Sequence, residues 1–176
     1  MFYKFNKSIS LILSFILICV LIVLDQFSKA MAITHLMNKE DIVLIPGVLQ
    51  LHYLENTGAA FSILEGKQVF FAILTPILLL ALVYIMLKMP RVKKFSILNS
   101  IIIFLIAGAI GNYIDRILNN YVVDFIYFSL INFPVFNIAD CYVTVAVFVL
   151  LVVVMFFYKD EDLEELKLSL KIKKNG

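Results

Sequence analysis

Residues 122–140 read VVDFIYFSLINFPVFNIAD and join an apolar, β-branched segment to the start of an apolar helix. Two acids, Asp124 and Asp140, lie in this stretch with no basic residue between them. A carboxylate is costly next to hydrocarbon, so an acid kept in such sequence needs a partner or a task. The stretch therefore predicts a strand and a helix start that together hold a polar site.

The chain around this stretch is too apolar for a soluble domain of 176 residues. It is 62% hydrophobic and 16% charged, and its mean hydropathy is +0.99. These values indicate an integral membrane protein, and the net charge of +2 is too small to suggest nucleic acid as a partner. The two cysteines lie far apart and the two histidines are isolated, so we expect no disulfide framework, no metal site and no cofactor.

Four uncharged runs are long enough to cross a bilayer, because about 20 helical residues match a hydrocarbon core near 30 Å. They cover residues 8–24, 68–87, 95–114 and 141–158. The two longer connections between these runs, 25–67 and 115–140, contain strand-like segments. In the first of them, IVLIPGVLQLHYL carries a turn signal at Pro46-Gly47. The predicted fold is an all-α membrane protein with four transmembrane helices and a small extracytoplasmic β platform.

The distribution of Lys and Arg predicts the orientation of the chain. Eleven of these residues lie in segments 1–7, 88–94 and 159–176, and four lie in the two longer connections. By the positive-inside rule, both termini face the cytoplasm and the connections face outward. We therefore expect one membrane domain over residues 1–158 and a charged cytoplasmic tail over 159–176.

The polar residues near the membrane all belong to outer helix ends or outer connections, so we expect them at one depth. Each also has a structural interpretation. Asp140 can cap the fourth helix, and Asp25 with Lys29, or Asp115 with Arg116, can form ion pairs at helix ends. Besides these and Asp124, the set contains Asn56, Asn112 and Asn137.

Asp124 is the hardest of these residues to explain by structure alone. It interrupts an apolar strand and has no cationic neighbour in sequence. A buried carboxyl without a cation is expected to take a proton or to share one with another acid. Asp140 is the natural partner, and two such carboxyls can activate a water and protonate a leaving amine without a metal.

Five blocks extend from Asp25 to Asp140, in the order DQFSK, ENTGAAFS, GNYIDR, VVDF and FNIAD. Together they resemble the lipoprotein signal peptidases, the type II signal peptidases of bacteria. The resemblance implies an aspartic endopeptidase of the bacterial cytoplasmic membrane, with its active site near the outer face. One departure is Cys141, which follows Asp140 where the family often has serine.

The resemblance also implies roles for single residues. Asp124 and Asp140 match the catalytic dyad, whereas Asp25, Lys29 and Asp115 match or adjoin supporting positions. The substrate implied is a prolipoprotein that carries diacylglycerol, cut just before its lipidated cysteine in contact with membrane lipid. The positions that match residues lining the site, where they hold the substrate and orient the acids, are Asn56, Asn112, Arg116 and Asn137.

Two other classes of function remain open from the residues themselves. The acids could bind protons or cations in a small transporter, or the polar residues could hold helices together in a non-catalytic assembly factor. A transporter often has inverted repeats or paired broken helices, and the sequence shows neither.

Overall fold

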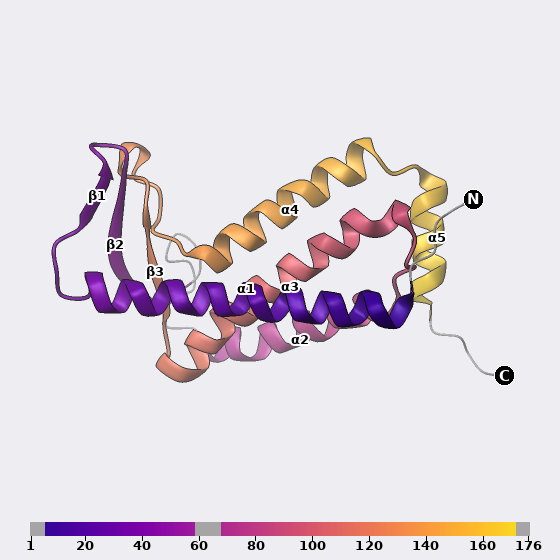
Figure 1. The fold of residues 1–176 in the computed structure, drawn as a ribbon, viewed down its shortest axis with the longest axis horizontal. Coiled ribbons are helices and arrows are strands. Elements are labelled where there is room, and N and C mark those ends of the chain that lie inside the picture. Colours follow the sequence, from indigo (N-terminus) through magenta and orange to yellow (C-terminus); the bar gives the residue numbers. More distant parts are fainter. Residues whose placement is uncertain (1–5, 59–67, 172–176) are drawn as a thin grey trace.

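The computed structural model of the chain describes residues 6–58 and 68–171, which form a bundle of helices with a small sheet at one end (Figure 1). Short 3₁₀ helices precede α3 and follow β3, at Lys93–Phe95 and Ser129–Ile131. The main elements, in chain order, are α1 (Lys7–Leu36), β1 (Ile42–Ile45), β2 (Leu49–Asn56), α2 (Gln68–Lys88), α3 (Ser96–Asn119), β3 (Val122–Tyr127), α4 (Ile138–Phe156) and α5 (Asp160–Leu170).

Four helices of the described residues are long and apolar enough to cross a membrane. They lie at Lys7–Leu36, Phe70–Lys88, Lys93–Asn119 and Ile138–Phe156. The predicted fold class, four membrane helices with a small β platform, is confirmed by these helices and by the three-stranded sheet.

Helix α1 is longer than its predicted span, which ended at residue 24. Asp25 and Lys29 therefore lie inside the helix. The prediction that they lie at its end is wrong. The extension forms because its last two turns have their own core to bury: Ala32 and Leu36 pack against Val123 and Phe125 of β3. The helix thus joins the bundle to the sheet without a break.

Helix α3 lies at the centre of the bundle and packs against α1, α2 and α4. Gly108 allows the closest of these contacts, because an added Cβ would lie 2.6 Å from the Ala139 carbonyl oxygen and 2.7 Å from Val143 Cγ2 of α4. Small residues let membrane helices approach closely, and here the approach brings the first turn of α4 against α3.

The sheet is antiparallel, in the order β1-β2-β3, with the predicted turn at Pro46-Gly47 between the first two strands. Asn56 pairs with Val122, and Leu54 pairs with Asp124. Because alternate residues of a strand share a face, Asn56 and Asp124 are diagonal neighbours on the same face.

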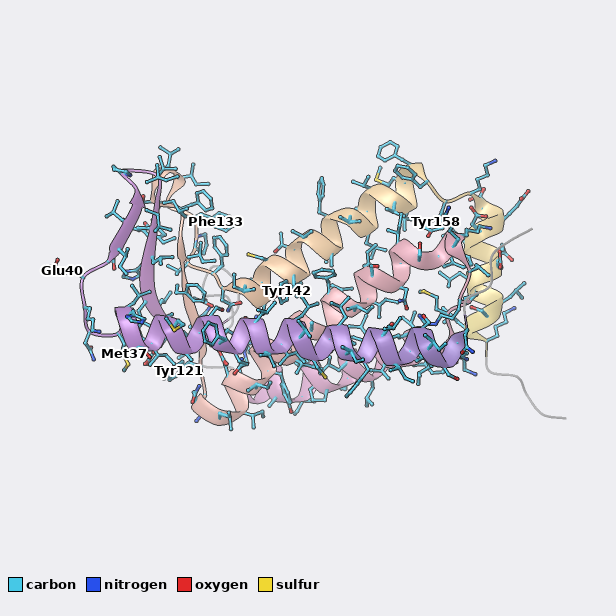
Figure 2. The ribbon with its side chains drawn as sticks, in the orientation of Figure 1. Met37, Glu40, Tyr121, Phe133, Tyr142 and Tyr158 are labelled. Atoms are coloured by element: carbon cyan, nitrogen blue, oxygen red, sulfur yellow. The ribbon has the colours of Figure 1, made fainter. Side chains whose placement is uncertain are left out.

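Helix α5 packs at the other end of the bundle, beside the start of α3 (Figure 1). The Tyr158 hydroxyl, labelled in Figure 2, donates to the Lys94 carbonyl at 2.7 Å. Lys94 also pairs with Asp162 and, at 3.2 Å, with Glu165. These contacts hold α5 against the bundle.

Candidate active site

Asp124 and Asp140 both line one cavity of about 570 Å³ where the sheet meets the helices. Asp124 is central in β3 and 1% exposed, and Asp140 lies in the first turn of α4. The two acids are 16 residues apart in sequence and come together because the segment after β3 returns the chain to the start of α4.

Asn137 connects the two acids. Its side-chain Nδ2 donates to Asp124 Oδ1 at 2.6 Å, and its backbone N–H donates to Asp140 Oδ2 at 3.1 Å. Its Oδ1 accepts from the Asp140 backbone N–H at 3.0 Å, which completes a capping box at the start of α4. Asp140 is therefore part of a helix cap, through its Oδ2 atom and its backbone N–H. Its other carboxyl oxygen, Oδ1, takes no part in the cap and can contact other residues of the cavity.

Two further amides complete the contacts of the acids. Asn56 Nδ2 donates to Asp124 Oδ2 at 2.8 Å, and Asn112 Nδ2 donates to Asp140 Oδ1 at 2.7 Å. Each of the four carboxyl oxygens thus has a donor. Neutral amides fix the orientation of the acids without adding the positive charge that would hold both of them ionised.

The pKa of Asp124 is unusually high for an aspartate. Burial, and then the negative charge of Asp140, raise its pKa from 3.8 to about 7, although its hydrogen bonds to Asn56 and Asn137 oppose the shift. A carboxyl with such a pKa can hold a proton at neutral pH and give it up during a reaction.

Lys29 of α1 is a buried cation next to the dyad residues and is 2% exposed. Its Nζ lies 2.9 Å from Asp25 Oδ2 and 3.1 Å from Asp115 Oδ2. It also donates to Asn112 Oδ1 at 2.9 Å, and this contact leaves the Nδ2 group of Asn112 to face Asp140. The buried cation therefore orients a residue that touches the dyad.

The two acids beside Lys29 also hold backbone groups. Asp25 Oδ1 accepts from the Ala139 N–H of α4 at 2.9 Å, and Asp115 Oδ2 accepts from the Val123 N–H of β3 at 3.1 Å. The cluster thereby ties α1 and α3 to the two segments that carry Asp140 and Asp124.

The structural interpretation of Asp115 and Arg116 as an ion pair does not hold, because Asp115 pairs with Lys29. Adjacent residues of a helix do not face each other, and Asp115 turns towards Lys29. Arg116 Nη2 instead donates to the Gly58 carbonyl at 3.2 Å, and the guanidinium lies 4.7 Å from the centre of the Phe71 ring. Arg116 lines the cavity with the dyad, and its buried Nε–H has no partner among the described residues.

Most of the cavity wall is apolar. Leu78 of α2, Ala109 of α3 and Val145 of α4 contribute to it. Phe133, on the segment between β3 and α4, also lines the cavity and lies beside the sheet (Figure 2). The cavity therefore combines a pair of acids with walls suited to a lipid-soluble ligand.

All predicted site residues gather at this end of the bundle, and the structure adds two residues that sequence reasoning missed. Gln26 Nε2 donates to Asp115 Oδ1 at 3.0 Å and to the Gly111 carbonyl at 3.1 Å. A Cβ added at Gly111 would lie 2.5 Å from Asp25 Oδ2. Gln26 lies inside the DQFSK block and Gly111 inside the GNYIDR block. Their place in these blocks was the signal in the sequence that could have identified them. Residues 59–62 of ENTGAAFS lie outside the described residues.

Asp124 and Asp140 are the two carboxyls that line the cavity. In residues 6–58 and 68–171, no group of three or more His, Cys, Asp and Glu side chains is arranged to hold a metal ion. A protonated and an ionised carboxyl that share a cavity can act together as a general acid and a general base.

Comparisons of sequence agree on one group of proteins. The profile of the family described as Signal peptidase (SPase) II matches residues 17–157. A lipoprotein signal peptidase of Enterococcus faecalis is 43% identical over 138 residues, which cover 78% of this chain and 84% of that protein. A lipoprotein signal peptidase of Streptococcus pyogenes is 39% identical over 142 residues, covering 81% and 90%.

Two solved structures of bacterial membrane enzymes are similar to the chain. A bacterial membrane enzyme solved at 2.3 Å superposes with a TM-score of 0.74 and 34% identity, over 88% of this chain and 92% of that one. A second bacterial membrane enzyme, solved at 1.9 Å, has a TM-score of 0.70 and 35% identity, over 82% and 94%.

Proposed function

The chain belongs to the signal peptidase II family of bacterial membrane proteases, and from this premise we propose its substrate and the residues that act on it. The substrate is a prolipoprotein with diacylglycerol on the cysteine at the cleavage point. The enzyme cuts the peptide bond just before that cysteine, so the signal peptide and the lipidated protein separate.

Asp124 and Asp140 form the catalytic pair in this proposal. The observation that carries it is the bridge through Asn137, which holds two carboxyls in one cavity. Asp124, whose pKa is raised to about 7, begins the reaction protonated and donates a hydrogen bond to the scissile carbonyl oxygen. Asp140 begins ionised and takes a proton from the water whose oxygen attacks the carbonyl carbon.

In the second half of the reaction Asp140 gives up the proton that it took from the water. As the C–N bond breaks, the proton held by Asp140 passes to the leaving amine nitrogen, and the carbonyl re-forms as a carboxyl group. Asn56, Asn112 and Asn137 keep the acids oriented through both steps. The Arg116 guanidinium, which lines the cavity, can bind a substrate carbonyl or ester oxygen.

Asp25, Lys29 and Asp115 have a supporting role in this proposal, because each acts on the dyad through another group. The apolar wall formed by α2, α3 and α4 accepts the acyl chains and the signal helix from the membrane. We assign residues 1–158 to the membrane peptidase and residues 159–176 to a cytoplasmic tail. Both termini then face the cytoplasm, and the dyad lies near the outer face of the membrane.

The transporter and the assembly factor are not favoured, because the matching relatives are peptidases. The decisive assay uses purified protein in detergent and a diacylglyceryl-modified precursor peptide, with cleavage followed as a gel shift. We expect a shift for the wild type and none for Asp124→Asn. Asp41→Asn is the matched control, because Asp41 is a solvent-exposed residue that contacts His52. A wild-type protein that leaves the precursor intact but passes ions in liposomes would overturn the proposal.

A further inference from the structure

A second cavity, of about 480 Å³, lies at the end of the bundle away from the sheet. It is formed by the first turns of α1, the start of α3 and the segment that joins α2 to α3. Ile9, Leu13 and Leu17 of α1 and Ile103 of α3 supply apolar wall. Its size falls in the range of small-molecule sites, roughly 300–1,000 Å³.

Arg91 lines this cavity and is a buried cation, 7% exposed, that forms no ion pair within residues 6–58 and 68–171. Nη2 donates to the Met86 carbonyl at 2.6 Å, and Nη1 donates to Asn99 Oδ1. The buried Nε–H has no partner in the described part of the chain. Burial lowers the pKa of the guanidinium, but an arginine keeps its charge.

The surroundings of Arg91 favour an anion rather than a second cation. The 3₁₀ helix Lys93–Phe95 runs directly into α3 beside Arg91, and neither helix has a side-chain cap at its start, so the positive end of the helix dipole adds to the charge. Of the basic residues nearby, Lys94 is already paired with Asp162 and Glu165. Asn99 Nδ2 donates to Ser14 Oγ at 3.3 Å, so two further polar residues of the cavity lining are joined to Arg91.

We propose that this cavity binds a phospholipid of the leaflet opposite the dyad. The phosphate group pairs with Arg91, and one acyl chain follows the apolar wall of α1. The occupant is a lipid rather than a free phosphate because the charged group and the apolar wall belong to the same cavity, which a small anion would leave unfilled.

The test uses purified protein in detergent and native mass spectrometry with three probes. They are phosphatidylglycerol, a diacylglycerol with the same acyl chains, and inorganic phosphate. We expect phosphatidylglycerol to bind about tenfold or more tightly than diacylglycerol, as for the loss of a charged hydrogen bond. Equal binding of the two lipids would overturn the proposal, and so would inorganic phosphate binding as tightly as phosphatidylglycerol.

Two variants locate the bound lipid. Arg91→Gln removes the charge and should weaken phosphatidylglycerol binding about tenfold. Because that variant removes buried hydrogen bonds and can fail to fold, a second variant is Leu13→Trp, which enlarges an exposed residue of the cavity lining and keeps Arg91. It should weaken binding as much. Ile16→Trp is the control, on an exposed residue of α1 that does not line the cavity. Unchanged binding in Leu13→Trp would place the lipid elsewhere and refute the assignment.

Discussion

Replacing Lys29 by methionine tests whether the buried cluster supports the dyad. Methionine keeps most of the apolar length of lysine and removes the charge, so Asp25 and Asp115 lose their common cation. At an effective dielectric constant of about 20, each pair at this distance is attracted by about 5 kcal/mol, most of which the burial of the charges offsets. Removing one partner of a buried ion pair costs about 3–5 kcal/mol, because the remaining charge stays buried.

The measurement is the apparent melting temperature in detergent, together with cleavage at a temperature well below it. For a chain of this size we expect a fall of roughly 10 °C. The double variant Lys29→Met/Asp115→Asn should recover part of the loss, because it removes one of the stranded acids. Lys39→Met is the control, on an exposed lysine that donates to the Thr34 carbonyl.

Activity separates support from bulk stability in the same variants. Lys29→Met also frees the Asn112 amide that faces Asp140, so the cleavage rate of the folded fraction should fall as well. A Lys29→Met protein that melts at the wild-type temperature would refute the charge argument. Full activity at a lowered melting temperature would refute the positioning of Asn112 by Lys29.

Two further predictions concern the dyad, and a third concerns the orientation of the chain in the membrane. Asp124→Asn and Asp140→Asn should each abolish cleavage with near-normal expression, and the double variant should lose no more activity than either single variant. Asparagine caps a helix about as well as aspartate. Cleavage by Asp140→Asn above about a tenth of the wild-type rate would therefore favour the cap role alone. The raised pKa of Asp124 means that the folded state binds its proton more tightly than the unfolded state. Stability should therefore fall as the pH rises from about 4 to about 7, as measured by unfolding against pH, and Asp124→Asn should flatten this slope. Reporter fusions at position 90 and the C-terminus should report cytoplasm, and fusions near 40 and 125 the outside; an external C-terminus would contradict the orientation.

The helices and the polar residues of the site could be predicted from the sequence because both depend on local composition. An uncharged run of about 20 residues has few alternatives to a membrane helix. Polar residues at the ends of such runs fall at one depth whatever the packing. Asp25, Asn56, Asn112 and Asp140 were therefore grouped correctly without knowledge of a single contact.

The contacts could not be predicted, because they depend on how helices rotate and where they end. The continuation of α1 to Leu36 depends on packing against β3, which lies about 90 residues further along the chain. The turn of Asp115 towards Lys29, and of Arg116 towards the Gly58 carbonyl, depends on the rotation of α3. Gln26 carries no charge and was passed over, although it joins two of the acids.

The unbroken α1 helix makes bilayer thickness a variable of the reaction. Its 30 residues extend about 45 Å, against a hydrocarbon core of about 30 Å. A helix that exceeds the core responds to a thinner or thicker membrane by changing its tilt. Because α1 packs on β3 through Ala32 and Leu36, the sheet and Asp124 must tilt with it. The depth of the acids relative to the lipid ester groups would then change with acyl-chain length, so the same enzyme would cut at different rates in membranes of different lipids.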